Sequence, residues 1–320
     1  MKNLIAILCV VSGMALLWFS MPAQHPALQI DQQQELLSGA VDFPELDSYF
    51  QADRLHRLVV SSANHHELEF QQVIYKDEKG TTYTALIDPH ETSSSTPVAN
   101  PENNEQAWHQ LTLKIKQLPA EPSVLLSWWD NSQRVHFFTG SQVWLTLPVA
   151  EMFAESTQAV WQQLSGGFSS NATDSRHYAE WLMMDADNAL KAIQSQFKTT
   201  SVRLLASIDD LSRLSEIAAL TNQPIPFETR TFQIADNLHS LISQVKRWSK
   251  DSATGSYLIQ KISPTQIRAW KITSPAGEQT LMARMLPFTS SLALPIDGLE
   301  LLFRSKPGGL LSLYQVVESS

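Results

Sequence analysis

The sequence has 320 residues, of which 43% are hydrophobic and 17% charged, and its formal net charge is −9. This composition is typical of a globular protein rather than a disordered or fibrous one. The acidic charge argues against a nucleic-acid partner, because binding to phosphates normally requires a basic surface. The sole cysteine, Cys9, excludes an internal disulfide, a zinc site of the CxxC type and a CxxCH attachment for covalent haem.

An apolar run from Leu4 to Met21 is nearly long enough to span a bilayer as a helix. We predict that residues 1–22 form a single membrane anchor. Lys2 is the sole basic residue before Arg54, so the positive-inside rule places the N-terminus in the cytoplasm. The bulk of the chain then lies in the periplasm, held to the inner membrane. The alternative is a signal peptide cleaved after Ala23, although the residues before that position make a poor cleavage site.

The next segments differ in composition. Residues 23–56 are rich in glutamine and acidic side chains, with a short helical pattern over Gln32 to Ser38, and are interpreted as a stalk. Residues 57–90 alternate and are rich in β-prone side chains, with a turn at Lys79-Gly80, and predict a small β-rich unit. Residues 91–106 have exchanged large apolar side chains for Ser, Thr, Pro and Asn, so we expect a flexible loop.

Residues 107–222 predict an α/β domain, because strand and helix patterns follow one another along the chain. Strands are expected over Trp108 to Leu118, which alternates, and over the apolar runs Ser123 to Leu126 and Ser201 to Ala206. Amphipathic helices are expected over 148–165, after an N-cap at Asp185, and after an N-cap at Asp209 or Asp210.

Residues 223–320 are expected to begin with a helix from about Phe232 to Trp248 and then to be rich in strands. The strand-like runs are 256–262, 265–273, 279–286, 298–304 and 310–317. The prediction for the whole chain is a mixed α/β fold: an anchor helix, a small β-rich unit, and an α/β domain with a β-rich C-terminal part.

Trp128, Trp129 and Asp130 stand at the carboxyl end of a predicted strand, where open α/β sheets usually bind ligands. In one interpretation, the indoles wall a groove and the Asp130 carboxylate accepts a ligand hydrogen bond, so that these residues and Arg134 are candidate binding residues. In the other, the rings are core packing, and Asp130 caps a short helix that ends at Gly140 while it pairs with Arg134. The sequence leaves both open.

Common catalytic and metal-binding motifs are absent from the sequence. There is no GxSxG elbow, GxxxxGK[ST] loop or GxGxxG fingerprint, and the histidines lack the HxxxH or HxH spacing of a metal site. His65 and His66 are adjacent and would point to opposite faces of a strand. We therefore expect no metal and no cofactor, and the sequence favours a protein that is not an enzyme.

Part of the sequence resembles the extramembrane C-terminal domain of oligosaccharyltransferase catalytic subunits. The similar segments are VLLSWWDNSQRV at 124–135, the helix, strand and helix of 185–220, and the closing strands LELLFR and LLSLYQVVE. That family has a Trp-Trp-Asp-Tyr-Gly motif, which holds the hydroxyl side chain of the acceptor sequon. Asn131 and Ser132 replace its tyrosine and glycine. Its donor site and metal-binding carboxylates lie in a membrane domain of many spans, so the resemblance does not extend to transferase chemistry.

Taken as a whole, the order of one anchor, a β-rich insert and a solitary Trp-Trp-Asp domain resembles the hydroxylamine oxidation protein HaoB family. That family is encoded beside the multihaem hydroxylamine oxidoreductase of ammonia- and methane-oxidising bacteria. The resemblance implies a periplasmic, membrane-anchored accessory protein that binds, or helps to mature, a partner such as this oxidoreductase. The alternatives are an enzyme acting on a peptide or glycan, with Asp130 as hydrogen-bond acceptor or base in a groove walled by Trp128 and Trp129, and a purely structural membrane tether.

Overall fold

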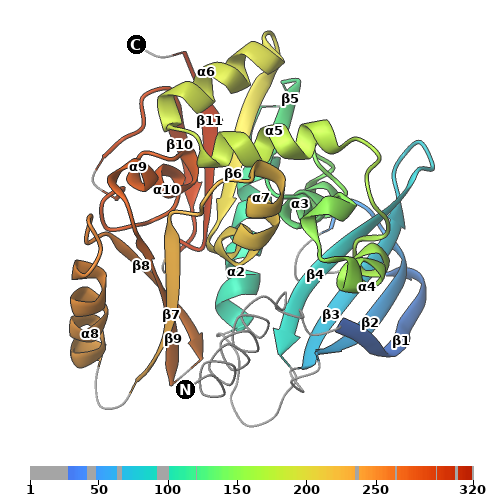
Figure 1. The fold of residues 1–320 in the computed structure, drawn as a ribbon. Helices are drawn as coiled ribbons and strands as arrows, with labels where there is room; N and C mark the ends of the chain where they lie inside the picture. The colour runs from blue at the N-terminus through green and yellow to red at the C-terminus, as the bar shows by residue number, and fades with distance from the viewer. Residues whose placement is uncertain are drawn as a thin grey trace, which may run out of the picture.

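In the residues that it describes, the computed structural model has three β-sheets with helices packed around them (Figure 1). It describes residues 28–41, 48–62, 67–91, 101–119, 121–234, 238–263, 265–292, 294–306 and 309–318. For this part of the chain the expected mixed α/β class is confirmed. Within these ranges, no helix is both long and apolar enough to cross a membrane. The anchor expected over residues 1–22 lies outside them.

The first sheet is an antiparallel meander in the order β1-β2-β3-β4. Its strands are β1 (Leu28–Val41), β2 (Ala52–Ser62), β3 (Glu67–Lys76) and β4 (Thr82–Glu91). The expected turn at Lys79-Gly80 joins β3 to β4. The expected helix over Gln32 to Ser38 is wrong, because this segment continues β1 and pairs with β2. Leu28 and Ile30 pack on the core at the start of the strand. Part of the segment interpreted as a stalk therefore belongs to a sheet.

The second sheet is mixed and has the order β10-β11-β6-β5. β5 (Ser123–Leu126) runs parallel to β6 (Ser201–Ser207). β11 (Leu311–Val316) pairs antiparallel with both β6 and β10 (Leu299–Arg304). The four segments that form this sheet were all expected as strands from their apolar runs, and that expectation is confirmed. Since β11 lies between β10 and β6, the sheet joins segments that are far apart in the sequence.

Helices cover both faces of the second sheet, because consecutive apolar side chains of β5 and β6 point to opposite faces and both are buried. On one face, Leu125 and Leu205 share a core cluster with α2 (Pro101–Lys116). On the other, Leu126 and Leu204 belong to the largest core cluster. The elements that contribute to that cluster include α4 (Glu155–Ser165), α5 (Ala172–Met183), α6 (Ala186–Phe197), α7 (Leu214–Thr221) and α10 (Leu281–Met285).

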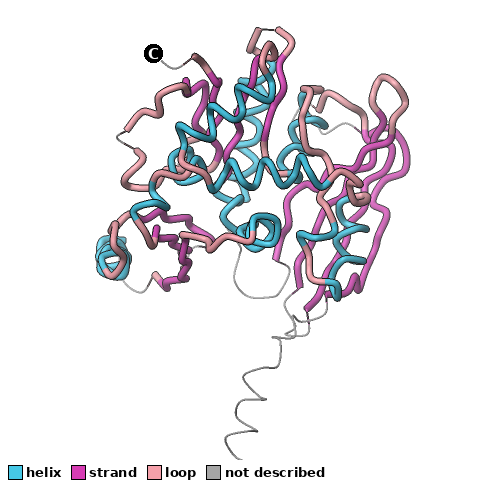
Figure 2. Tube along the Cα trace, turned by 45° about the horizontal axis from the view of Figure 1, so that its top comes forward, coloured by secondary structure: helices cyan, strands magenta, loops and turns pink. Residues whose placement is uncertain are grey.

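The third sheet has the order β7-β9-β8 and lies at the opposite end of the molecule from β1–β4 (Figure 2). Its strands are β7 (Phe227–Gln233), β8 (Tyr257–Ser263) and β9 (Gln266–Ile272), all antiparallel. One face is covered by α8 (Leu238–Lys250), whose Leu241 and Val245 pack on Phe232 and Ile267. A short helix, α9 (Pro275–Glu278), follows the sheet. The strands expected near 256–262 and 265–273 are confirmed, whereas β7 occupies the start of the helix expected from Phe232.

The strand expected over Trp108 to Leu118 is wrong, because α2 continues to Lys116. Its letters alternate, but Trp108, Leu111 and Ile115 also have the spacing of one helix face and are buried. Leu113, which a buried strand face would cover, is 40% exposed. The start of α2 at Pro101 also places a helix in the second half of the expected loop 91–106.

Two further expectations differ from the structure. The helix expected over 148–165 is divided into a 3-10 turn, η1 (Ala150–Met152), and α4, with Phe153 and Ala154 between them. The strand expected over 279–286 is mostly α10, which begins where the Thr280 hydroxyl accepts the N–H of Ala283 at 3.3 Å. The helix after Asp185 is confirmed, with Asp185 as its N-cap. Helix α5 was not expected from the sequence.

Gly166 and Gly80 provide a matched test of the packing between α4 and the first sheet. Both have left-handed backbones, with φ of 81° and 80°. A Cβ at Gly166 would lie 2.6 Å from Cβ of Thr84 on β4, whereas a Cβ at Gly80 would meet nothing within 4 Å. Gly80→Ala should cost about 1–2 kcal/mol of unfolding free energy from backbone strain alone. Gly166→Ala should cost about 1–3 kcal/mol more, because the helix must also move away from β4. Urea denaturation of both variants checks this, and equal losses would contradict it.

Candidate functional site

The Trp-Trp-Asp motif lies where β5 ends and α3 (Trp129–Thr139) begins. Trp128 is the N-cap residue of α3 and has an extended backbone, with φ −62° and ψ 153°. Its main-chain oxygen accepts the N–H of Ser132 at 2.9 Å, the first bond of the helix. The exposed fraction is 1% for Trp128 and 0% for Trp129. The motif therefore places both indole rings in the protein interior.

Glu216 of α7 accepts hydrogen bonds from both of these rings. Its Oε2 atom accepts the indole N–H of Trp128 at 2.8 Å and that of Trp129 at 3.0 Å. Its Oε1 atom accepts a bond from Nη1 of Arg213 at 3.0 Å. Glu216 itself is only 4% exposed. Since an indole has one donor and needs an acceptor when buried, this one carboxylate satisfies two adjacent tryptophans.

Arg213 lies between two carboxylates at the end of the 3-10 helix η2 (Ile208–Arg213). Its Nη2 and Nε atoms donate to Oδ2 of Asp130 at 2.8 and 3.1 Å. The guanidinium carbon also lies 5.5 Å from the ring centre of Trp129 and 5.1 Å from that of Trp161. Planar guanidinium groups stack on aromatic faces and bind carboxylates at the same time. Arg213 therefore connects Asp130, Glu216 and the aromatic rings.

Asp210 forms a second connection between α3 and η2. Its Oδ1 atom accepts the side-chain N–H of Asn131 at 2.8 Å, and its Oδ2 atom accepts the main-chain N–H of Ser207 at 2.8 Å. Ser207 and Asp210 together form a capping box at the start of η2. The hydroxyls of Ser127 and Ser132 are 2.7 Å apart and join the end of β5 to α3. The residues that follow the Trp-Trp-Asp motif thus also bond inside the protein.

Burial dominates the electrostatics of this cluster. It raises the pKa of Asp210 well above the usual 3.8, although the hydrogen bonds from Ser207 and Asn131 act in the opposite direction. Burial also raises the pKa of Glu216, and the charge of Arg213 only partly opposes it. Burial lowers the pKa of Arg213, but the carboxylates of Asp130 and Glu216 more than offset it, so the net shift is upward. Arg213 therefore stays charged and holds the cluster together.

Three of the four candidate binding residues lie in this cluster. Trp128 and Trp129 are buried, as the core-packing interpretation expects, and in the described structure they do not wall an open groove. Asp130 has a side chain 20% exposed, and its partner is Arg213. Asp130 is not the N-cap of α3, because Trp128 has that position, although its Oδ1 atom accepts the N–H of Asn131 at 2.9 Å. The expected capping role is therefore wrong.

Arg134 lies elsewhere. Its Nε atom donates to the main-chain oxygen of Leu86 on β4 at 2.8 Å, and its guanidinium carbon lies 5.0 Å from the ring centre of Trp108. It is 7% exposed. The expected pair between Asp130 and Arg134 one turn apart is replaced by the pair between Asp130 and Arg213. Arg134 instead connects α3 with the first sheet and α2.

Sequence reasoning missed Arg213 and Glu216, and it assigned Asp210 only a capping role. One signal was available, since Arg213 and Glu216 are three residues apart and can pair on a helix. Nothing in the spacing shows that this pair meets tryptophans more than 80 residues earlier. Within the described ranges, this cluster included, no group of three or more His, Cys, Asp or Glu side chains is placed to hold a metal ion.

A family model described as "HaoA-associated protein HaoB" matches residues 1–316. The chain belongs to the HaoB family. The match includes all three sheets as far as Val316 and the Trp-Trp-Asp cluster, and it confirms the resemblance seen in the sequence. The description connects the HaoB family with HaoA, and the name of the family model connects it with nitrification. Association with hydroxylamine oxidation is therefore supported at the level of the family. No curated protein matches the chain.

Among solved structures, the HaoB-family chain is similar to the C-terminal globular domain of an oligosaccharyltransferase from Archaeoglobus fulgidus. The two sequences are 10% identical, and the match covers 66% of this chain and 97% of that domain, with a TM-score of 0.34. The similarity is to the protein family whose motif the Trp-Trp-Asp segment resembles. At this TM-score it implies no shared site and no shared activity.

Glu216 and Asp130 offer a matched comparison within the cluster of this HaoB-family chain. Each gives Arg213 a carboxylate, but Glu216 is fully buried and also accepts two indole bonds. Glu216→Gln should cost about 3–5 kcal/mol of unfolding free energy, because it leaves buried donors and one buried charge poorly paired. Asp130→Asn should cost about 1 kcal/mol, because water reaches this partly exposed position. Chemical denaturation checks both values. A larger loss for Asp130→Asn than for Glu216→Gln would contradict the central role of Glu216 in the cluster.

Asp210 predicts an unusual pH dependence. Its raised pKa means that, as the pH rises above 3.8, the unfolded chain releases this proton before the folded chain does. The contribution of Asp210 to stability is therefore complete at low pH and falls as the pH rises toward the folded-state pKa, by at most about 1.4 kcal/mol per pH unit. Asp210→Asn should lack this loss. We expect the free energy of unfolding of the wild type, relative to that of Asp210→Asn, to fall from pH 4 to pH 8, as measured by urea denaturation. Parallel curves would refute the shift.

Proposed function

We propose that this HaoB-family chain is a membrane-anchored accessory protein of hydroxylamine oxidation. It binds HaoA, the hydroxylamine oxidoreductase, or helps HaoA to mature. The observation that carries this proposal is the match of the HaoB family model to residues 1–316, because that family is described by its association with HaoA. The protein acts through contact with a partner rather than through a reaction of its own.

The Trp-Trp-Asp cluster supports a binding role over a catalytic one. A general acid or base must reach the substrate with the atom that carries or accepts the proton. The carboxylates of Asp130, Asp210 and Glu216 are bonded to Arg213, to Asn131 and to the buried indoles. Through these bonds, the polar atoms of the motif are paired with other groups of the protein itself. The cluster then serves to hold the fold that the partner recognises.

The proposed location follows from the N-terminal sequence. The apolar run from Leu4 to Met21 is nearly long enough to span a bilayer, and Lys2 precedes it on the side expected to remain in the cytoplasm. The folded part of the chain then lies in the periplasm, on the surface of the inner membrane.

The test is recovery of HaoA with the tagged chain. With an affinity tag after Ser320, HaoA should co-purify from membranes of the native host solubilised in mild detergent, since a specific interface survives dilution. An untagged strain and a strain with an unrelated tagged membrane protein are the controls. Immunoblotting and mass spectrometry identify the eluate. Recovery of the intact chain without HaoA would contradict the proposal that HaoA is its partner. A soluble form of the protein that begins near Gln24 would contradict the proposed membrane anchor but not the proposed partner.

A further inference from the structure

Strand β7 is an edge strand in the described structure. The third sheet has the order β7-β9-β8, so β7 pairs with β9 on one side and with no described strand on the other. Residues 228–231 in its centre are all exposed. An edge strand presents unpaired N–H and C=O groups, and natural proteins usually cover or disrupt such an edge unless it is used. Here the centre of the strand is regular and contains no proline.

The ends of the β7-β9 ladder show which backbone groups point outward. The N–H of Ile234 donates to the main-chain oxygen of Thr265 at 2.7 Å, and the main-chain oxygen of Pro226 accepts the N–H of Thr273 at 2.9 Å. Residues with even numbers therefore turn their backbone groups toward β9. In an antiparallel ladder the alternate residues turn theirs the other way. The N–H and C=O groups of Thr229 and Thr231 thus point away from β9, to the side on which no described strand pairs with β7.

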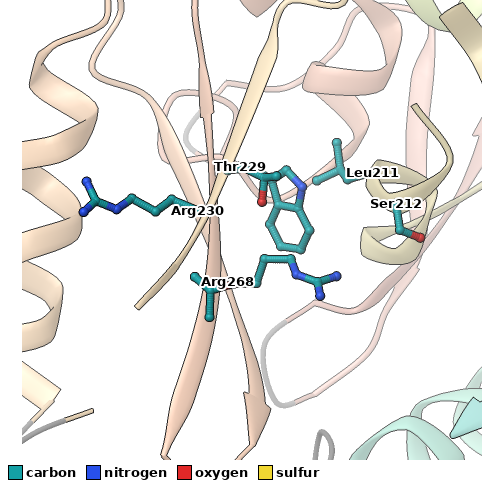
Figure 3. A pocket seen from close by; sticks show the side chains of 7 residues that line it. Leu211, Ser212, Thr229, Arg230 and Arg268 are labelled. Carbon is teal, nitrogen blue, oxygen red and sulfur yellow. The ribbon is translucent and has the colours of Figure 1, made fainter. Parts of the chain in front are cut away.

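A hollow of about 410 Å³ adjoins this edge, between the third sheet and η2. It is lined by Leu211 and Ser212 of η2, Thr229, Arg230 and Thr231 of β7, and Arg268 and Trp270 of β9. Figure 3 shows the Arg268 side chain extending from the sheet toward η2, whereas that of Arg230 extends to the other side. Trp270 also lines the hollow, but its side chain is only 2% exposed. The hollow therefore combines hydroxyl groups with one guanidinium, that of Arg268, which extends toward η2.

Arg268 gives the hollow its charge. Its guanidinium carbon lies 5.9 Å from the ring centre of Trp270, and among the described residues it has neither an ion pair nor a hydrogen bond. Two nearby charged groups are engaged, since Lys271 pairs with Glu228 at 3.1 Å and Asp209 accepts a bond from Gln260 at 3.0 Å. The chain as a whole has a net charge of −9. An acidic ligand is therefore repelled by most of the surface and attracted where an arginine is unpaired.

We propose that the β7 edge and this hollow bind an extended, acidic segment of the partner protein, which adds to the sheet as a fourth strand. This inference rests on the proposed function, in which the partner is HaoA. The main chain of the segment pairs with the outward groups of Thr229 and Thr231, as in other cases of strand addition. An aspartate or glutamate of the segment enters the hollow and pairs with Arg268. The backbone provides affinity, and Arg268 selects acidic sequences.

The experiment compares four variants of the full chain, purified in detergent, for binding to purified HaoA by calorimetry. Arg268→Glu reverses the charge in the hollow and should weaken binding about tenfold or more, with the effect reduced at high salt. Thr231→Pro removes an outward N–H, while an edge strand tolerates proline at such a position, and should also weaken binding about tenfold. Thr231→Val has nearly the same shape and keeps the N–H, so its loss should stay below about fivefold. Arg247→Glu on α8 makes the same charge change away from the hollow and should bind as wild type does.

Melting curves and circular dichroism of each variant separate a lost contact from a lost fold, and Arg268→Glu decides if Thr231→Pro does not fold. Wild-type binding that both Arg268→Glu and Thr231→Pro leave unchanged would overturn this inference and leave the proposed function standing. Failure of wild type to bind HaoA would overturn both. If wild type is a dimer that Thr231→Pro converts to a monomer, the edge joins two copies of this chain and the inference is wrong.

Discussion

The region around the Trp-Trp-Asp motif depends on the hydrogen bonds that the buried carboxylate of Glu216 accepts. This carboxylate accepts hydrogen bonds from Trp128, Trp129 and Arg213. Removing a carboxylate from water costs several kcal/mol, and here three donors offset that cost. The dependence is mutual, because each indole would lack an acceptor without Glu216. Neither α3 nor α7 can therefore take its place independently of the other.

The position of this cluster follows from the pairing of two strands in the second sheet. Arg213 and Asp210 belong to η2, which begins directly after β6, while the tryptophans follow β5. The parallel pairing of β5 and β6 brings the two carboxyl ends to the same edge of the sheet. Side chains from the two connections meet there and bond to one another. A place that often forms a ligand site in open α/β sheets is occupied here by the protein's own side chains.

The sequence predicts the buried strands well, because runs such as Ser123 to Leu126 are apolar and short and have few other ways to be buried. It fails where one pattern of apolar residues fits both a strand and a helix. In α2 the apolar and polar residues alternate as in a strand, but Trp108, Leu111 and Ile115 also share one helix face. In the candidate site, two adjacent tryptophans are visible in the sequence. Their acceptor is not, since Glu216 lies 87 and 88 residues away and only the fold brings it near. The partner of Asp130 is hidden for the same reason: a helical spacing permits a pair with Arg134, but the fold brings Arg213 within 2.8 Å of Asp130.

The position of β11 has a consequence for how the chain is made. β11 pairs with β6 on one side and β10 on the other, and the β6 pairing joins Leu311 to Ser207, more than one hundred residues earlier. Until Leu311–Val316 has been synthesised, the apolar strand β6 has no neighbour on that side. Long-range pairings of this kind fold slowly and leave strand edges exposed to aggregation. The nascent chain therefore exposes one edge of β6 until late in synthesis, and a product truncated before Leu311 would lack the strand that joins β6 to β10 in the second sheet.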